Sequence, residues 1–167
     1  MTDKNVSIMN IGSMGYLPQV FKKIENEKKL NIVYLGGSIT MGCNATKTEL
    51  RYVDRSAKWW QTNFPDAEIS YFNAGIGATT SQFGVARVQE HVLDKQPDLV
   101  FVEFSVNDSS SPLFMETYES LVRRLLKAES VKAVVLINNL FYDTGTNAQG
   151  IHNAIGLHYD LPIVSVR

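Results

Sequence analysis

The chain alternates between short apolar segments and longer amphipathic segments, and this alternation constrains its fold more than any other feature. Apolar, β-branched runs typical of strands occur at residues 31–35, 68–72, 99–104, 133–137 and 163–166. Helical patterns occupy the intervals, at 51–63, 81–94, 113–128 and 147–159. Repeated strand–helix units predict a parallel sheet with right-handed crossovers. We therefore predict a flavodoxin-like, doubly wound α/β/α sandwich with about five parallel strands and helices on both faces.

A further helical pattern precedes the first strand. Residues 17–29 have apolar residues at helical spacing and Pro18 at an early helical position. We predict an N-terminal extension with an amphipathic helix, residues 1–29, followed by an α/β domain, residues 30–167. Such domains place a final helix against the sheet after the last strand, and we expect that helix to be missing. Apolar sheet surface would then be uncovered, and either the N-terminal helix covers part of it or two copies associate there as a homo-oligomer.

Composition argues against several classes of partner. The 167 residues are 44% hydrophobic and 20% charged with a net charge of -1, which indicates neither nucleic acid nor an anionic membrane as a partner. No apolar run is long enough to span a bilayer, and Met1–Asn5 lack a signal-peptide core, so we expect a cytoplasmic protein. The single cysteine, Cys43, excludes an intrachain disulfide and a cysteine-built metal site. We expect no metal and no cofactor.

Three short signatures follow the first three predicted strands. They are Gly36-Gly37-Ser38-Ile39-Thr40, Asn73-Ala74-Gly75-Ile76-Gly77 and Ser105-Val106-Asn107-Asp108. Ligands of doubly wound sheets bind beyond the carboxyl ends of the strands, near the point where the strand order reverses. The placement of the signatures therefore predicts that they form one site.

Each signature supports a chemical interpretation and a simpler one. Ser38 follows two glycines and can expose its hydroxyl as a nucleophile, or it can cap a helix or belong to a phosphate-binding turn. The Gly77 N–H can donate to a developing oxyanion, or the glycine can only shape its turn. The neutral amide of Asn107 is a good oxyanion donor, although Asn107 and Asp108 also suit a plain turn.

In order and placement, these signatures resemble the blocks of the SGNH (GDSL-like) hydrolase family, and within it the bacterial carbohydrate-esterase-like branch. The resemblance covers residues 30–166 and includes Trp59-Trp60 and Pro97-Asp98-Leu99-Val100. It implies that Ser38 is the nucleophile. It also implies an oxyanion hole made of the Ser38 and Gly77 N–H groups and the Asn107 side chain, and small acyl esters, with acetylated carbohydrate favoured, as substrates. Ser105 stands where the third block usually has glycine, a departure that we expect the fold to tolerate.

The last family block, Asp-x-x-His, supplies the general base and its orienting carboxylate, and it does not occur in this sequence. A serine hydroxyl is a poor nucleophile without an adjacent base, so we expect a truncated chain with impaired hydrolysis. The histidines present are His91, His152 and His158. His91 and His158 have the positions of helix-surface residues. His152 is the only substitute base. Its helical spacing to Ile151 and Ile155 also places it at the flank of a packing face, and we expect no catalytic role for it.

Two other functions remain open. A non-catalytic binding or interaction module would keep the pocket without the base. A nucleotide- or phosphate-binding domain of flavodoxin type would use Gly36-Gly37-Ser38 as a phosphate turn, but neither a P-loop lysine nor a Gly-x-Gly-x-x-Gly run is present.

Overall fold

The computed structural model describes residues 7–166, in which six strands form one sheet. The strands are β1 (Ile8–Asn10), β2 (Lys29–Gly36), β3 (Glu68–Gly75), β4 (Leu99–Glu103), β5 (Ala133–Asn138) and β6 (Ile163–Ser165). The α-helices are α1 (Leu17–Glu27), α2 (Ser38–Met41), α3 (Tyr52–Asn63), α4 (Ser81–His91), α5 (Pro112–Leu126) and α6 (Gln149–His158). Two short 3-10 helices, η1 (Thr48–Leu50) and η2 (Leu93–Lys95), complete the elements.

The strand order is β1-β6-β5-β4-β2-β3. Strands β2 to β6 pair in parallel, and their order is the flavodoxin-like one, which confirms the predicted doubly wound fold. The sequence pattern missed β1, which pairs antiparallel with β6 at the edge of the sheet. This strand has only three residues, and the first two are exposed, so it carries no apolar run that sequence reasoning can detect.

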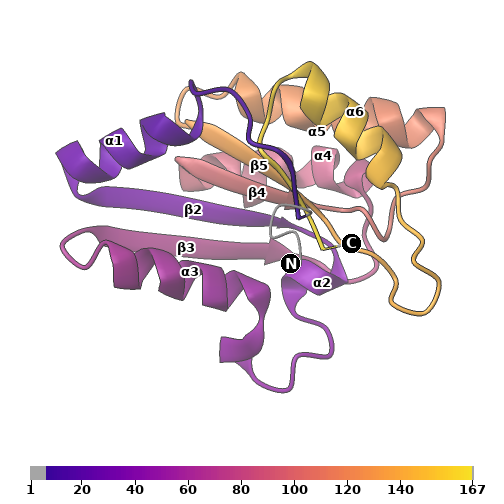
Figure 1. Cartoon of the computed structure of the whole chain (residues 1–167), viewed down its shortest axis with the longest axis horizontal. Helices are drawn as coiled ribbons and strands as arrows, with labels where there is room; N and C mark the ends of the chain where they lie inside the picture. The colour runs from indigo at the N-terminus through magenta and orange to yellow at the C-terminus, as the bar shows by residue number, and fades with distance from the viewer. Residues whose placement is uncertain (1–6, 167) are drawn as a thin grey trace, which may run out of the picture.

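Helices cover both faces of the sheet, and each face has its own apolar core (Figure 1). Helices α4, α5 and α6 pack on one face through buried residues that include Val88, Leu121 and Ile155. On the other face, α1 and α3 contribute Val20 and Trp60. The predicted boundary between residues 29 and 30 stays a prediction, and in the structure α1 packs on the same sheet as the later helices.

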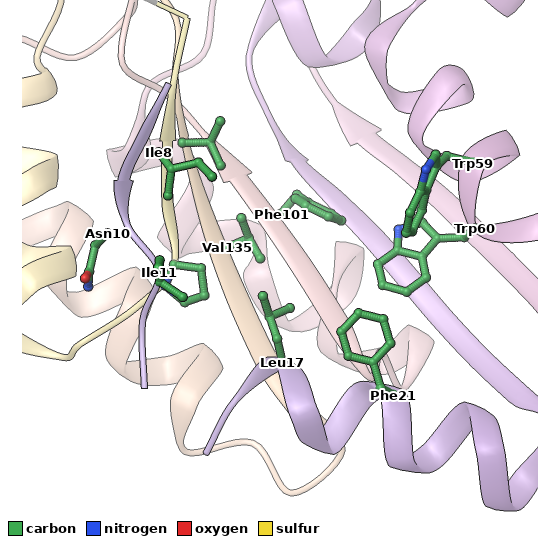
Figure 2. A pocket seen from close by; sticks show the side chains of 11 residues that line it. Ile8, Asn10, Ile11, Leu17, Phe21, Trp59, Trp60, Phe101 and Val135 are labelled. Atoms are coloured by element: carbon green, nitrogen blue, oxygen red, sulfur yellow. The ribbon is translucent and has the colours of Figure 1, made fainter. Parts of the chain in front are cut away.

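The face under α1 and α3 is only partly covered. An apolar groove of about 280 Å³ lies between these helices and β6. Phe101 and Val135 of the sheet form its floor, with Phe21 of α1 and Trp59 of α3 along its sides (Figure 2). Ile11, which is 74% exposed, lies at the end next to β1. In the structure, α1 packs on this face of the sheet and leaves the groove open beside it.

Other features of the described chain bear on its partners. Within residues 7–166, no helix combines the length and the apolar character needed to cross a membrane. The same residues contain no cluster of three or more His, Cys, Asp or Glu side chains suited to a metal ion. Cys43 is a free, exposed thiol.

A prediction about packing concerns Gly84 in α4. A Cβ atom added at Gly84 would lie 2.7 Å from Cζ of the buried Phe104 ring. Gly84→Ala should therefore overpack this contact at about 1–3 kcal/mol, which exceeds the gain of about 0.5–1 kcal/mol from replacing a helical glycine. We expect a net loss of about 1 kcal/mol in the free energy of unfolding, measured with urea.

The control is Gly150→Ala in α6, because nothing lies within 4 Å of a Cβ atom there. This variant should be as stable as the parent protein or slightly more stable. A Gly84→Ala protein that matches the Gly150→Ala protein in stability would show that α4 does not depend on close approach at residue 84.

Candidate active site

The three signatures meet because β2 lies between β3 and β4. The register pairs Gly36 with Gly75 on one side and with Glu103 on the other, so the three strands end at the same level. In Figure 1 the ends of β2 and β3 point toward α2, whose first residue is Ser38. A hydrogen bond from Ile76 N to Gly36 O (3.1 Å) joins the turns after β2 and β3 directly.

The contacts between the turns are close enough to require glycine. A Cβ atom at Gly37 would lie 2.8 Å from Asn107 Oδ1 and 3.3 Å from Thr79 O. The turn after β2 therefore lies against the Asn107 side chain and against the loop that follows Gly77. A side chain at Gly75 would overlap the backbone of Met41 at the end of α2. The structure thus brings together all three signatures that the sequence analysis singled out.

The groups expected to perform chemistry are accessible and unpaired. Ser38, Gly77 and Asn107 are each half-buried. Within residues 7–166, no hydrogen bond uses Ser38 Oγ, the N–H groups of Ser38 and Gly77, or Asn107 Nδ2. Asn107 Oδ1 is buried without a partner, which leaves the amide N–H₂ as the free end of that side chain. The site therefore has a hydroxyl and three free N–H donors on adjacent turns.

Asn73 supports this arrangement, although the sequence analysis gave it no role. Its Nδ2 donates to Thr40 O in α2 (2.8 Å), and its Oδ1 accepts from Gly75 N (2.9 Å). The side chain therefore holds the end of β3 against the helix that begins at Ser38. The signal was present, because Asn73 opens the second signature and is a polar residue at the end of a strand.

Glu103 is a second supporting residue that sequence reasoning missed. Its carboxylate is fully buried, with Ser105 Oγ 3.3 Å from Oε1 and Thr40 Oγ1 3.4 Å from Oε2. Burial raises the pKa of Glu103 to about 7, and hydrogen bonds that favour the charged form only partly offset this. A charged residue inside the apolar run 99–104 was the feature of the sequence that could have marked Glu103 as a buried, functional carboxylate.

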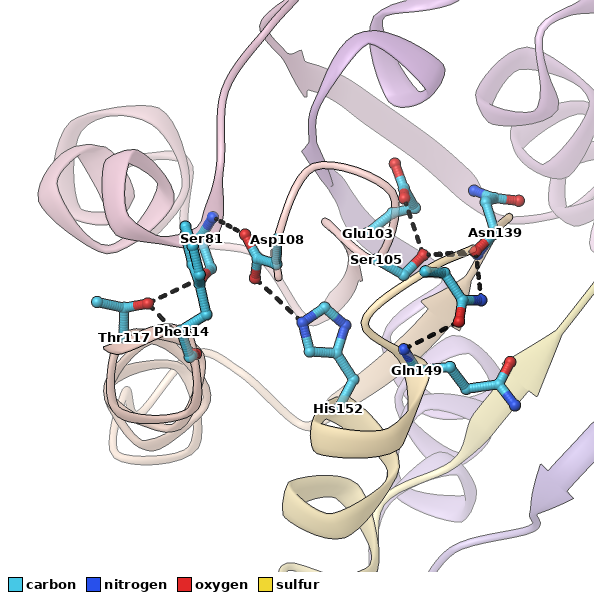
Figure 3. Close-up of polar contacts among 10 residues, drawn as sticks. Ser81, Glu103, Ser105, Asp108, Phe114, Thr117, Asn139, Gln149 and His152 are labelled. Carbon is cyan, nitrogen blue, oxygen red and sulfur yellow. Dashed lines mark hydrogen bonds and ion pairs between the residues drawn. The ribbon is translucent and has the colours of Figure 1, made fainter. Parts of the chain in front are cut away.

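Ser105 connects this carboxylate to the loop after β5. Its hydroxyl accepts a hydrogen bond from Asn139 N (2.7 Å) and also faces Glu103 (Figure 3). A glycine at this position would lack both contacts. The departure from the usual family residue is therefore accommodated by a hydrogen-bonded position in this fold.

The structure corrects the interpretation of His152 as a flank of a packing face. The imidazole is fully buried, stacks on the Tyr118 ring at 3.6 Å between centroids, and places Nε2 3.0 Å from Asp108 Oδ2 (Figure 3). The other oxygen of Asp108 accepts from Ser81 N (2.9 Å). Burial lowers the pKa of His152 more than Asp108 raises it, so the ring is a neutral donor to this carboxylate. The buried carboxylate is the partner that allows a histidine inside the core.

The other two histidines lie near helix ends. His91, half-buried, is the last residue of α4, and its Nδ1 lies 3.2 Å from Arg87 Nη1. His158 is exposed at the end of α6. None of the three histidines forms a hydrogen bond with Ser38, so no general base contacts the serine within the part of the chain that the structure describes.

The doubly wound sheet, with Ser38 in the turn at its switch point, defines a flavodoxin-like α/β/α-sandwich domain. The family model of the GDSL-like lipases/acylhydrolases matches residues 34–159, and the chain therefore belongs to this family. This confirms the resemblance drawn from the three signatures. The comparison with curated proteins found no match.

Among solved structures, the chain is similar to a two-domain esterase active on acetylated mannans, with 49% identity and a TM-score of 0.93 over 96% of this chain. The same esterase co-crystallised with mannopentaose gives 49% identity and a TM-score of 0.92 over 95% of the chain. This chain spans 43% of that esterase's length. A catalytic mutant of an acetylxylan esterase from Geobacillus stearothermophilus shares the fold at 18% identity, with a TM-score of 0.66 over 80% of this chain and 74% of the other.

Glu103 should make the stability of the protein depend on pH. The carboxyl is protonated in both states below pH 4.5, its ordinary pKa, but between pH 4.5 and about 7 only the folded state keeps the proton. The free energy of unfolding should therefore fall as pH rises through this interval, by about 3 kcal/mol in total. Glu103→Gln, which stays neutral, should lack this fall, so urea unfolding at pH 5 and pH 8 should separate the two proteins.

His152 works in the opposite direction, because its lowered pKa removes stability as pH falls below its ordinary value of 6.5. That contribution is common to both proteins and cancels in the comparison. Glu49→Gln, at an exposed carboxylate, is the matched control and should keep the parent's pH dependence. Parallel pH profiles for the parent and Glu103→Gln would contradict the buried, protonated state of Glu103.

Proposed function

We propose that this chain is an acyl-ester hydrolase domain that removes acetyl or other small acyl groups from carbohydrate esters through an acyl-serine intermediate. The observation that carries the proposal is the convergence of Ser38, Gly77 and Asn107 on adjacent turns with their donors free. The carbohydrate ester is favoured because a 49% identical protein is active on acetylated mannans.

In the proposed reaction, Ser38 Oγ loses its proton to a base and attacks the acyl carbonyl carbon. The carbonyl oxygen becomes an oxyanion that accepts hydrogen bonds from Ser38 N, Gly77 N and Asn107 Nδ2. The sugar oxygen then leaves with a proton, and water hydrolyses the acyl-serine to release the acid. Losing one oxyanion donor typically raises the barrier by about 2.7–4 kcal/mol, so Asn107 carries a large share of the expected acceleration.

Within residues 7–166 no base contacts Ser38, and we therefore propose that the 167-residue chain is itself a poor hydrolase. The members of a catalytic triad act as a unit, and the oxyanion hole alone retains only part of the acceleration. His152 is an unsuitable substitute because its Nε2 is occupied by Asp108 and the ring is buried.

A second candidate is a non-catalytic module that binds acylated carbohydrate in the same pocket. The same missing contact to Ser38 favours it. The two candidates differ in whether Ser38 reacts when a base is supplied, which decides the experiment.

The test is hydrolysis of p-nitrophenyl acetate by this chain and by Ser38→Ala, each with and without added imidazole as an external base. Without imidazole, both proteins should be close to background. With imidazole, the parent should exceed Ser38→Ala by at least about tenfold, since a general base contributes about 10²-fold or more when it is well placed. Subtracting the Ser38→Ala rate removes the direct reaction of imidazole with the ester.

Equal rates for the two proteins under all conditions would count against the esterase domain and in favour of the binding module. Binding of acetylated mannan oligosaccharides, measured by calorimetry on both proteins, would then support the second candidate. His152→Ala should leave the imidazole-dependent rate unchanged if it stays folded.

We also propose that two copies associate through the apolar groove between α1, α3 and β6. The groove presents exposed aliphatic and aromatic side chains, and uncovered apolar surface of this kind promotes association. Ile11→Lys should shift the protein toward monomer in light scattering over a dilution series, because it places a charge beside the groove. Leu113→Lys, at a 50% exposed position of α5 outside the groove, is the control. A parent protein that is monomeric at every concentration would contradict the association.

A further inference from the structure

Arg87 of α4 is buried directly behind the candidate site, and the reaction outlined above gives it no role. It is 6% exposed. Its Nη1 donates to Ala74 O at 2.7 Å and its Nη2 donates to Gly36 O at 3.1 Å. These carbonyls belong to the ends of β3 and β2, the strands that lead into Gly77 and Ser38. One guanidinium therefore joins the two backbone segments that present the candidate oxyanion donors.

The charge of Arg87 has no carboxylate partner. Within residues 7–166 no Asp or Glu forms an ion pair with it, and its Nε is buried without a partner. The groups that face it are the two carbonyls, His91 Nδ1 at 3.2 Å and the Phe83 ring at 5.8 Å to its centroid. Burial lowers the pKa of Arg87 to about 10, so it is charged at neutral pH. A buried cation without a counter-charge destabilises a fold, which points to a role other than stability.

The two peptide groups that Arg87 contacts are also held on their other side. In the peptide that links Gly36 to Gly37, the carbonyl accepts from Arg87 and from Ile76 N, while Gly37 N donates to Glu103 O (3.3 Å). In the peptide that links Ala74 to Gly75, the carbonyl accepts from Arg87 and Gly75 N donates to Asn73 Oδ1. Each plane is therefore fixed in orientation. The Ser38 N–H belongs to the next peptide after the first plane, and the Gly77 N–H follows two peptides after the second.

We propose that Arg87 is a positioning residue, whose planar guanidinium holds the ends of β2 and β3 in the relative orientation that aims the Ser38 and Gly77 N–H groups at one oxyanion. Its catalytic meaning rests on the proposed esterase function. The proposal explains the residue type, because the rigid fork of arginine reaches two acceptors at once, whereas lysine is a single flexible point charge. It also places a positive charge behind the turns where negative charge develops during acyl transfer.

The first test measures, without reference to activity, the clamp that Arg87 forms by bonding Ala74 O and Gly36 O. Amide hydrogen exchange is followed by NMR at Gly37, Gly75 and Ile76, whose N–H groups are bonded at the clamp, and at core amides of β4 and β5 as the reference. Arg87→Met should speed exchange at the three clamp amides by about tenfold or more relative to the core amides, a change that corresponds to about 1.4 kcal/mol of local protection. Arg87→Lys should have a smaller effect, because it keeps the charge but not the bridge.

The matched control is Arg124→Met. Arg124 is an exposed arginine whose Nη1 donates to a backbone carbonyl of α4, Val85 O, at 3.1 Å. This variant removes the same kind of hydrogen bond away from the site, and it should leave exchange at the clamp amides and the hydrolysis rate unchanged.

The second test measures hydrolysis of p-nitrophenyl acetate with imidazole supplied. Arg87→Met should lower kcat by about 10- to 100-fold with KM unchanged within about twofold, because misaligned donors affect the transition state rather than ester binding. Arg87→Lys should recover part of kcat. A rise in KM together with a fall in kcat, both in proportion to the loss of stability of each variant, would overturn the positioning role.

The outcomes separate the inference from the proposed function. If the parent shows no Ser38-dependent hydrolysis, the esterase proposal fails while the exchange experiment still decides whether Arg87 holds the turns. Unchanged exchange at the clamp amides, or an equal increase at the core amides, overturns the proposal whatever the activity. If Arg87→Met does not fold, Arg87→Lys decides: parent-like exchange and kcat in that variant would also overturn it.

Discussion

The parallel pairing of β2 with both β3 and β4 is the constraint on which the site depends. The side chains of β2 and β4 are mostly buried beneath helices, and a shift by one residue would turn those side chains to the opposite face. Because the register pairs Gly36 with Gly75 and with Glu103, the three strands end together. The turns that follow must then share one small volume, which is why only glycine fits at residues 37 and 75.

A layer of buried polar groups supports these turns from below. Glu103 accepts hydrogen bonds from the Thr40 and Ser105 hydroxyls, and Arg87 donates to carbonyls of β2 and β3. Asp108 is hydrogen-bonded to His152. Burial disfavours the charged forms of Glu103, Arg87 and His152, as the directions of their pKa changes show. Of these groups, Arg87 and Asp108 bind backbone atoms of β2, β3 and α4, and the apolar cores on both faces of the sheet offset the free-energy cost of burying them.

The elements that could be predicted were those whose signal is local in the sequence. Strands such as β4 and helices such as α5 have long, regular apolar patterns, and their observed bounds agree closely with the predicted ranges. The edge strand β1 was missed because three residues at a sheet edge need little apolar character. The histidine at 152 was misplaced because helical spacing identifies a face but not the partner across it, and Asp108 is 44 residues away in the chain.

The sequence by itself determined the fold class, the family and the three turns that carry the candidate nucleophile and oxyanion donors. These follow from short-range patterns, namely apolar runs, helical spacing and motifs in a fixed order. The tertiary structure alone decided which groups support the site and which do not reach it. Arg87 and Gly36 are 51 residues apart, and Glu103 and Thr40 are 63 residues apart. Their contacts depend on strand order and register, because hydrogen bonds between distant residues exist only after the backbone has been folded into the sheet.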